Sequence, residues 1–365
     1  MSIAERNQGA VQRAVSSRFS AAFDASSFGS IDQICKASSA RLKGFVWGDG
    51  EGRTPIVNDS HISFAAAVVR EGISRLSETG NTRLSVRTVA SNDAVGELTR
   101  RMAAVGASVE AVMPIGEDYS IIYIGYNSQQ RELGEHRRQM QQEAVAAARR
   151  YRDNPAELAE LANDIIDHAG TYSTRIIDGN SRNFSEIEIS SISGLLATFG
   201  YDANQARSMV ENEQNIIGLV YHNSAANQRT VVGISITERR SITLANGRVL
   251  QIAELTDGTV SKEVSGRSLY SRLLLNVYEH ILASHPELSL IFAESNVGSE
   301  ALLKAAFLQG REEAGMLPNH VEIRNRETNA PELKSLLVTY LTRERMAESI
   351  RRLGSALEFQ QVLRN

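Results

Sequence analysis

Val249-Leu-Gln-Ile-Ala-Glu-Leu-Thr256 is the stretch that decides the fold, together with the loop Ser265-Gly-Arg-Ser-Leu-Tyr270 and the apolar run Leu288-Ser-Leu-Ile-Phe-Ala-Glu294. The first and last segments are apolar runs of strand length. Between them, residues 268–283 are strongly apolar over the length of a helix. The order strand, loop, helix, strand predicts an α/β fold.

The segments around this unit extend the same pattern. The strongest hairpin signal in the chain, Asn246-Gly247, precedes it. Hydrophobic spacing predicts further helices and strands on both sides and a polar helix at the end. The expected helices are 187–199, 203–213, 299–307 and 344–363, and the expected strands are 216–221, 230–237, 315–324 and 336–341.

The first half of the chain contains a smaller α/β pattern. A helix over 62–76 is followed by a strand over 83–89, a helix ending near 105, and strands over 108–113 and 119–126. The next segment is rich in Gln, Glu, Arg and Ala and predicts helices broken at Asn154-Pro155. We therefore expect four parts: 1–127 as an N-terminal α/β domain, 128–170 as a helical connector, 171–345 as the main domain, and 346–365 as a C-terminal helix.

Composition narrows the class of protein. The chain has 365 residues, which predicts about two domains, and 39 basic against 43 acidic residues give a net charge of −4. This balance argues against a nucleic-acid binder. The single cysteine, Cys35, excludes an internal disulfide and argues against a cysteine nucleophile. Without an apolar run of membrane-spanning length, or an apolar leader at its start, the sequence predicts a cytoplasmic protein. We also expect no metal, because no cluster at metal-ligand spacing is evident.

The ordered segments from residue 249 onward resemble the GNAT superfamily of acyl-CoA N-acyltransferases. A closer resemblance is to the β-lysine N-acetyltransferases, carried by Ala253-Glu-Leu-Thr-Asp257, Leu273-Leu274, Ala293-Glu-Ser-Asn296, Lys304-Ala-Ala-Phe307 and Gly315-Met-Leu-Pro-Asn-His320. It implies a mixed sheet flanked by helices, with a smaller N-terminal α/β domain that corresponds to a degenerate GNAT-like half. It spans most of residues 62–342.

The resemblance also implies a donor site for acetyl-CoA or another acyl-CoA. In the superfamily, backbone N–H groups of a loop and the positive end of a helix face the donor's pyrophosphate. Here that loop consists of Ser265, Gly266, Arg267, Ser268, Leu269 and Tyr270. The β-lysine enzymes have Arg-Gly-Arg-Gly-Leu-Ala instead, so Ser265, Ser268 and the bulky Tyr270 depart from the pattern. These departures leave open an acyl carrier protein as donor, and also a non-catalytic binding module.

The resemblance places the reaction on the strand that ends at Thr256. Glu254 matches a carboxylate near the acceptor and would serve as a base; the alternative is a strand residue that faces solvent or forms a salt bridge. A backbone N–H group of Leu255 or Thr256 would polarise the thioester carbonyl. Asp257 would bind a second ammonium group of the acceptor, or cap a turn.

Three further residues follow from the same resemblance. Asn296 would contact the pantetheine amide, or cap the helix that follows it. Asn319 and His320 would lie near the acceptor, although a simple turn histidine is as good an interpretation. No tyrosine occupies 301–304, where many GNAT enzymes place the acid that protonates the thiolate. Tyr270 or Tyr278 could replace it, although helical spacing favours packing for both.

Together these observations predict an N-acyltransferase that acylates a primary amine of a small molecule, an amino acid or a natural-product amine, by direct attack. We expect no nucleic-acid or membrane partner. Superfamily members often pair, so the resemblance leaves a homodimer open, and the sequence alone does not set the oligomeric state.

Overall fold

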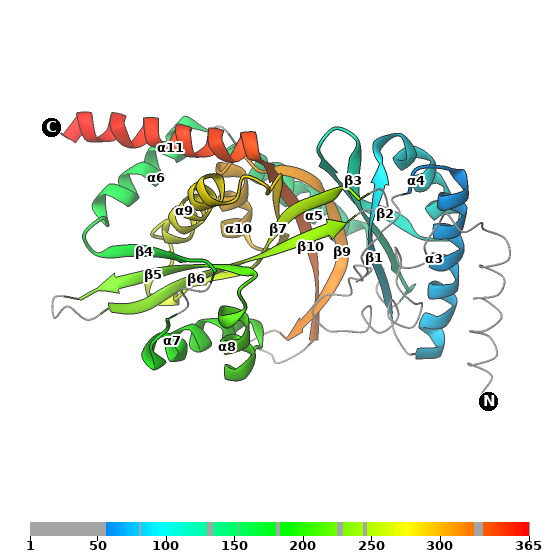
Figure 1. Ribbon diagram of the computed structural model, residues 1–365, viewed down its shortest axis with the longest axis horizontal. Helices are drawn as coiled ribbons and strands as arrows, with labels where there is room; N and C mark the ends of the chain where they lie inside the picture. Colours follow the sequence, from blue (N-terminus) through cyan, green and yellow to red (C-terminus); the bar gives the residue numbers. More distant parts are fainter. Residues whose placement is uncertain are drawn as a thin grey trace. The chain divides into compact units, whose positions relative to one another are not determined.

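The computed structural model describes residues 56–79, 82–129, 134–152, 154–179, 183–224, 229–243, 247–324 and 331–364 (Figure 1). The fold is mixed α/β, as predicted. The chain divides into two compact units. The first unit comprises Met1–Arg138, Ile242–Leu250 and Ala314–Leu336, and the second comprises Gln139–Ser241, Gln251–Glu313 and Leu337–Asn365. Cys35 and the hairpin residue Asn246 lie outside the described residues.

The first unit contains an antiparallel sheet covered by two helices. Strand β3 (Tyr119–Asn127) pairs with both β1 (Arg83–Ser91) and β2 (Ser108–Ile115). Helices α3 (Asp59–Thr79) and α4 (Val95–Ala104) pack on each other and on this sheet. Their shared core is apolar and contains Phe64, Leu84, Leu98 and Ile122. The helices and strands predicted between residues 62 and 126 are all confirmed.

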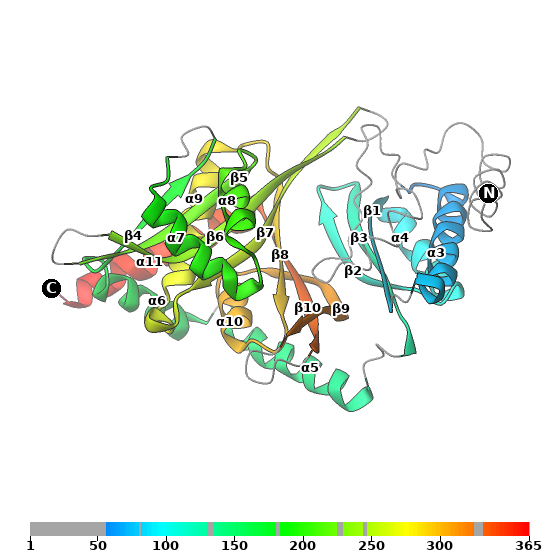
Figure 2. The ribbon, with the colours of Figure 1, turned by 90° about the horizontal axis from the view of Figure 1, so that it is seen from below.

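The second unit has the strand order β10-β8-β7-β6-β5-β4, with helices on both faces. Helices α7 and α8 lie on one face, whereas α6, α9 and α11 lie on the other (Figures 1 and 2). The strands are β4 (Tyr172–Ile177), β5 (Asn215–Asn223), β6 (Arg229–Thr243), β7 (Val249–Val260), β8 (Leu290–Asn296) and β10 (Pro331–Thr342); β9 (Glu312–Arg324) begins in this unit and continues in the first. The helices are α6 (Pro155–Asp167), α7 (Glu186–Leu196), α8 (Ala203–Glu211), α9 (Leu269–Ser284), α10 (Glu300–Leu308) and α11 (Arg343–Arg364).

Every predicted element of the second unit is present, but the prediction lacked β4. This strand pairs only with β5 and forms the edge of the sheet, and four of its six residues are not buried. An edge strand buries fewer side chains than a central one, so its hydrophobic pattern is weak. The missing strand matters because Asp178 follows directly after it.

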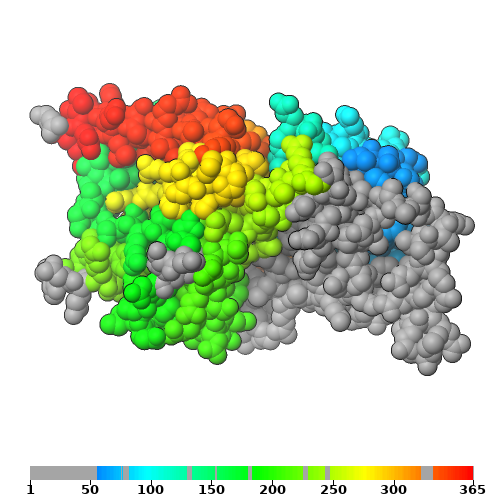
Figure 3. Space-filling model, in the orientation of Figure 1, coloured from blue at the N-terminus to red at the C-terminus, as the bar shows by residue number. Residues whose placement is uncertain are grey.

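The predicted break in the connector is confirmed. Helix α5 (Glu135–Ala148) ends before Asn154, whose side-chain oxygen accepts a hydrogen bond from the Ala156 N–H at the start of α6. Helix α6 and helix α11 pack together, and α11 also lies along α9 (Figure 3). Among the described helices, none combines the length and the apolar character that a bilayer span requires. Each unit is built from three segments that are not consecutive in the sequence. The linear domain boundaries at residues 127, 170 and 345 therefore stay a prediction.

Candidate active site

The parallel pair β7 and β8 forms the centre of the candidate site. Their register runs from Ile252 opposite Leu290 to Leu255 opposite Ala293. Both strands continue beyond this point, β7 to Val260 and β8 to Asn296. The paired register therefore stops where the chain reaches Thr256. Backbone groups of β7 after Leu255 are thus not engaged by β8.

The loop before α9 has an unusual backbone conformation. Ser268, immediately before the helix, has a φ of 51° and a ψ of 12°, and Gly266 has a φ of 80°. The left-handed region is costly for a residue with a Cβ, by about 1–2 kcal/mol, which is why glycine usually occupies it. Ser268 thus adopts a backbone conformation that glycine usually occupies. The first N–H groups of a helix lack partners within the helix and attract anions.

Side chains from elsewhere in the second unit hold this loop. The Ser268 hydroxyl donates to the Asp164 carboxylate of α6 at 2.6 Å. The Arg267 guanidinium donates to the Tyr172 hydroxyl and lies over the same ring. The Ser265 hydroxyl donates to the Lys262 carbonyl at 2.9 Å, which closes a local turn. A carboxylate therefore lies directly beside the proposed phosphate-binding turn.

Tyr270 projects from the first turn of α9 onto β7. A Cβ built on Gly258 would lie 2.2 Å from the Tyr270 hydroxyl, so the ring touches the strand only because residue 258 is glycine. Burial raises the pKa of Tyr270, and the charge of Arg311 offsets part of that rise. Tyr270 therefore stays protonated at neutral pH. Its neighbour on the strand, Asp257, accepts a hydrogen bond from Tyr201 at 3.2 Å.

Glu254 lies in the interior of β7 with only 1% of its surface exposed. Its carboxylate is 3.4 Å from the guanidinium of Arg240 on β6, which also pairs with Glu238 at 2.6 Å. The ion pair that the sequence left as an alternative is thus present. It fixes the carboxylate beside the strand segment where pairing with β8 ends. Thr256 donates its hydroxyl to the Glu254 carbonyl at 3.4 Å, and Leu255 is buried on the α9 side.

The remaining predicted residues have local partners. Asn296 accepts a hydrogen bond from the Gly298 N–H at 2.9 Å, whereas Ser299 caps α10. Asn319 and His320 belong to the first unit and are buried there. The Asn319 N–H donates to the Ser335 hydroxyl at 2.9 Å, and Arg83 donates to His320 at 3.0 Å. The predicted contact of Asn296 with the pantetheine arm and the predicted roles of Asn319 and His320 near the acceptor stay predictions.

Arg311 is a candidate that the sequence did not reveal. It is 1% exposed, donates to the hydroxyl of Tyr278, and lies 3.3 Å from the Gln309 side-chain oxygen. Its Nη1 atom is buried with no hydrogen-bond partner, and no carboxylate of the described residues forms an ion pair with it. Arg311 follows Gly310 in a turn, and nothing in the sequence around it indicates that its side chain is buried. Tyr278 is confirmed as a packing residue, since its ring is buried and its hydroxyl also donates to Gln309 at 2.6 Å.

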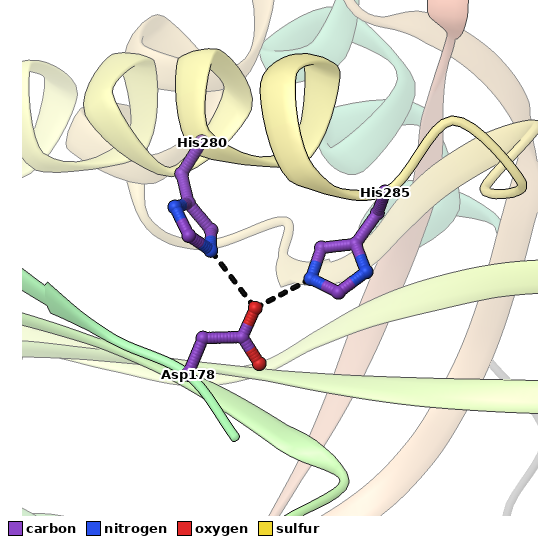
Figure 4. A group of neighbouring side chains, drawn as sticks. All are labelled: Asp178, His280 and His285. Carbon is purple, nitrogen blue, oxygen red and sulfur yellow. Dashed lines mark hydrogen bonds and ion pairs between the residues drawn. The ribbon is translucent and has the colours of Figure 1, made fainter. Parts of the chain in front are cut away.

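The expectation of no metal-binding group is not confirmed. Asp178, His280 and His285 bring one ligand atom each to within 4.8 Å of the others (Figure 4). The two histidines lie at the C-terminal end of α9, which ends at Ser284. Their carboxylate partner comes from a segment about a hundred residues earlier, so no local spacing connects them.

Comparisons with known proteins give a mixed result. No family model matches the chain, and no curated protein sequence matches it. Solved structures that are similar include NAA60 of Arabidopsis thaliana in complex with acetyl-CoA, with 7% identity, a TM-score of 0.38, and coverage of 47% of this chain and 98% of that one. The ribosomal-protein-S18-alanine N-acetyltransferase of Escherichia coli has 13% identity, a TM-score of 0.34, and coverage of 47% and 94%. An N-acetyltransferase of Staphylococcus aureus Mu50 has 14% identity, a TM-score of 0.36, and coverage of 47% and 98%.

Each of these three structures matches 47% of this chain. The two bacterial proteins are N-acetyltransferases. Because the TM-scores lie below 0.5, the case for a function rests on the geometry of β7, β8 and α9. The resemblance to the β-lysine N-acetyltransferases finds no support in the comparisons and stays an interpretation of the sequence.

Proposed function

We propose that the second unit is a GNAT-type N-acyltransferase that transfers an acetyl or other short acyl group from a CoA thioester to a primary amine of a small molecule. One observation carries this proposal: the β7–β8 pairing stops after Leu255 and Ala293, and a left-handed turn at Ser268 opens α9. Where strand pairing stops, backbone N–H and C=O groups can bind the extended pantetheine arm of the donor, which contains amide groups. A helix N-terminus offers N–H groups to its phosphates.

The residues of β7 would carry the chemistry. The amine nitrogen attacks the thioester carbonyl carbon, and a backbone N–H group of Leu255 or Thr256 stabilises the oxyanion. Glu254 takes the proton that the nitrogen loses, through a water molecule. When the C–S bond breaks, the thiolate takes a proton from water or from Tyr270, whose raised pKa keeps it protonated. The products are an amide and a free thiol.

The donor would be held by the loop from Ser265 to Tyr270 and by Asn296. The acceptor would be recognised by Asp257, which suits a second ammonium group. These assignments are supported by the resemblance of the sequence and by the buried position of Glu254. An amino acid or a natural-product amine fits such a polar acceptor site.

The test is thiol release from acetyl-CoA with a panel of amines, followed by mass spectrometry of the products. The Glu254→Gln variant should lower kcat by about 10²–10⁴-fold, the usual contribution of a general base. Glu238→Gln is the matched control, because it removes the other carboxylate that pairs with Arg240. Equal turnover in the Glu254→Gln variant would remove the base assignment. Absence of thiol release with every amine, despite donor binding, would favour a non-catalytic binding module.

An acyl carrier protein is the second candidate donor, and a specific observation favours it. The Asp164 carboxylate lies against the turn that would face the donor's phosphates, hydrogen-bonded to Ser268 at 2.6 Å. Full CoA carries more phosphate charge than a carrier-bound phosphopantetheine, so a carboxylate here disfavours CoA more strongly.

Wild-type turnover with each donor separates the two candidates. The Asp164→Asn variant tests the effect of the carboxylate, because it removes one charge and keeps the shape, and it should bind CoA more tightly by a few-fold. If CoA is the natural donor, the wild-type chain should already turn over acetyl-CoA. If a carrier protein is the donor, wild-type turnover with an acyl carrier protein should exceed turnover with acetyl-CoA at equal concentration.

A further inference from the structure

At the end of α9 away from the donor loop, three side chains converge from two segments of the second unit. Asp178 follows β4, His280 lies in the last turns of α9, and His285 follows that helix (Figure 4). The Asp178 Oδ2 atom is 2.9 Å from the His280 Nε2 atom and 2.5 Å from the His285 Nε2 atom. Their side chains are 15%, 27% and 9% exposed, so the group is shielded but reachable.

We infer that Asp178, His280 and His285 form a binding site for a divalent transition metal, with Zn²⁺ as the ion that suits them. Two imidazoles and one carboxylate are a ligand set that zinc commonly takes. Zinc binds nitrogen at about 2.0–2.1 Å, which places neighbouring ligand atoms of a tetrahedron about 3.3 Å apart. The ligand atoms already lie within 4.8 Å of one another. The Asp178–His280 and Asp178–His285 pairs would each have to separate by less than about 1 Å to admit the ion.

The polar contacts and the ion pair around the group supply a second argument. A metal-bound histidine usually donates its other ring N–H to a carboxylate or carbonyl, and a metal-bound carboxylate is usually held through its other oxygen. The His285 Nδ1 atom lies 3.0 Å from the Glu287 carboxylate. The Asp178 Oδ1 atom lies 3.4 Å from the Arg239 guanidinium, which backbone carbonyls of Glu213 and Gln214 hold in place. With these two contacts made, the His285 Nε2 atom and the Asp178 Oδ2 atom are directed at each other.

The two ring nitrogens of His285 face different partners. The Nε2 atom lies 2.5 Å from the Asp178 carboxylate, whereas the Nδ1 atom lies 3.0 Å from the Glu287 carboxylate and 3.4 Å from a nitrogen of Arg239. A zinc ion on Nε2 would leave Nδ1 to donate to Glu287. Asp178 and Glu287 then balance the charge of the ion, against the single positive charge of Arg239.

Three protein ligands leave one position of the tetrahedron to water. The bound ion would tie edge strand β4, which pairs only with β5, to the end of α9. Helix α9 has 16 residues, so this site lies about 24 Å along the helix from the donor loop. The proposal therefore does not depend on the acyl-transfer function.

The test uses the full chain without an affinity tag, stripped with a chelator and titrated with Zn²⁺ and, as a spectroscopic probe, with Co²⁺. We expect one Zn²⁺ per chain, a higher Tm with Zn²⁺, and intense visible absorption from tetrahedral Co²⁺. Asp178→Asn and His280→Gln should each weaken Zn²⁺ binding by at least about 100-fold, and Glu287→Gln by about 10–100-fold. His168→Gln, a histidine of the same unit outside the group, should bind as the wild type does.

Two results would overturn the site. One is a wild-type chain that binds no Zn²⁺ and whose Tm does not change. The other is unchanged Zn²⁺ affinity in both Asp178→Asn and His280→Gln. If either variant fails to fold, the Co²⁺ spectrum of the wild type decides: tetrahedral absorption supports the site, and the spectrum of hydrated Co²⁺ contradicts it.

Discussion

Arg83, Arg87 and Arg311 are almost completely buried among the residues that the structure describes, and the surroundings of Arg83 and Arg311 differ. Arg83, in the first unit, makes a two-pronged contact with Glu110 at 2.5 and 3.1 Å and also donates to Asn127 at 2.8 Å and to His320. Arg311, in the second unit, donates to the neutral side chains of Tyr278 and Gln309, and its Nη1 atom has no hydrogen-bond partner.

The difference separates a structural charge from one available for function. A buried charge whose partners are all supplied by the protein stabilises one arrangement of the core, and removing a partner is costly. A buried charge without a carboxylate is itself costly and stays only where something compensates for it. Arg311 acts electrostatically on Tyr270, which touches β7 in the candidate site. We therefore regard Arg311 as a positioning residue of that site and Arg83 as a structural residue.

Arg83→Met should have the largest effect on stability. It leaves the Glu110 carboxylate buried without its partner, which costs about 3–5 kcal/mol of unfolding free energy. Urea denaturation followed by circular dichroism measures this loss. The double variant Arg83→Met with Glu110→Leu should recover part of it, because no unpaired charge remains. If the Arg83→Met variant were as stable as the wild type, the Arg83–Glu110 pair would not stabilise the fold.

Gly258→Ala should come next, with a loss of about 1–3 kcal/mol from overpacking against the Tyr270 ring. The measurement is a double-mutant cycle with Tyr270→Ala. In the Tyr270→Ala background the added methyl group has space, so the cost of Gly258→Ala should largely disappear. Equal costs in both backgrounds would show that Tyr270 does not lie on β7.

Arg311→Met should change stability by no more than about 1 kcal/mol, because an apolar side chain of similar length replaces a charge that lacks a carboxylate. Its kcat for acyl transfer should nevertheless fall, by about tenfold, through the altered surroundings of Tyr270. KM for the donor should stay nearly constant. A stability loss as large as that of Arg83→Met, with unchanged kcat, would make the two arginines equivalent.

The smallest predicted effect on the free energy of unfolding is that of replacing Glu188, and this effect depends on pH. Burial raises its pKa, but hydrogen bonds from Tyr221 and Ser185 outweigh this, so its pKa lies below the ordinary value of 4.5. A lowered carboxyl pKa stabilises the fold above pH 4.5, and this contribution is lost as the pH falls through the folded-state pKa. Burial and Glu188 raise the pKa of Tyr221 to about 12, so the donor remains protonated throughout.

Glu188→Gln should therefore cost about 1 kcal/mol at pH 7 and little near pH 3. Urea denaturation at the two pH values measures the difference. An equal cost at both values would show that the charge of Glu188 contributes nothing.

The sequence predicted most helices and strands because their apolar spacing is strong, as in α3 and α9. It did not predict β4, whose residues Ser173, Thr174 and Arg175 are polar or exposed as befits an edge strand. The helix break at Asn154 was predictable because capping is a local interaction.

The candidate site was predictable only where it follows the chain. Glu254, Ser268 and Tyr270 occupy consecutive segments of one strand–loop–helix unit, and a resemblance in order was enough to single them out. Asp164 comes from 104 residues before Ser268, and Asp178 from 102 residues before His280. The side chain of Arg311 is buried by tertiary packing that leaves no periodic signal. Contacts of this kind depend on the three-dimensional arrangement of the unit.

Hydrogen–deuterium exchange with S-acetyl-4′-phosphopantetheine, the part common to both candidate donors, tests the central claim most directly. We predict that amides of residues 255–260 and 265–270 exchange more slowly at saturating ligand, because β7 and the start of α9 bind the pantetheine arm and its phosphate. Peptides from the first unit's β1–β3 sheet should exchange at unchanged rates. Unchanged exchange in 255–260 and 265–270 at saturating ligand would contradict the account.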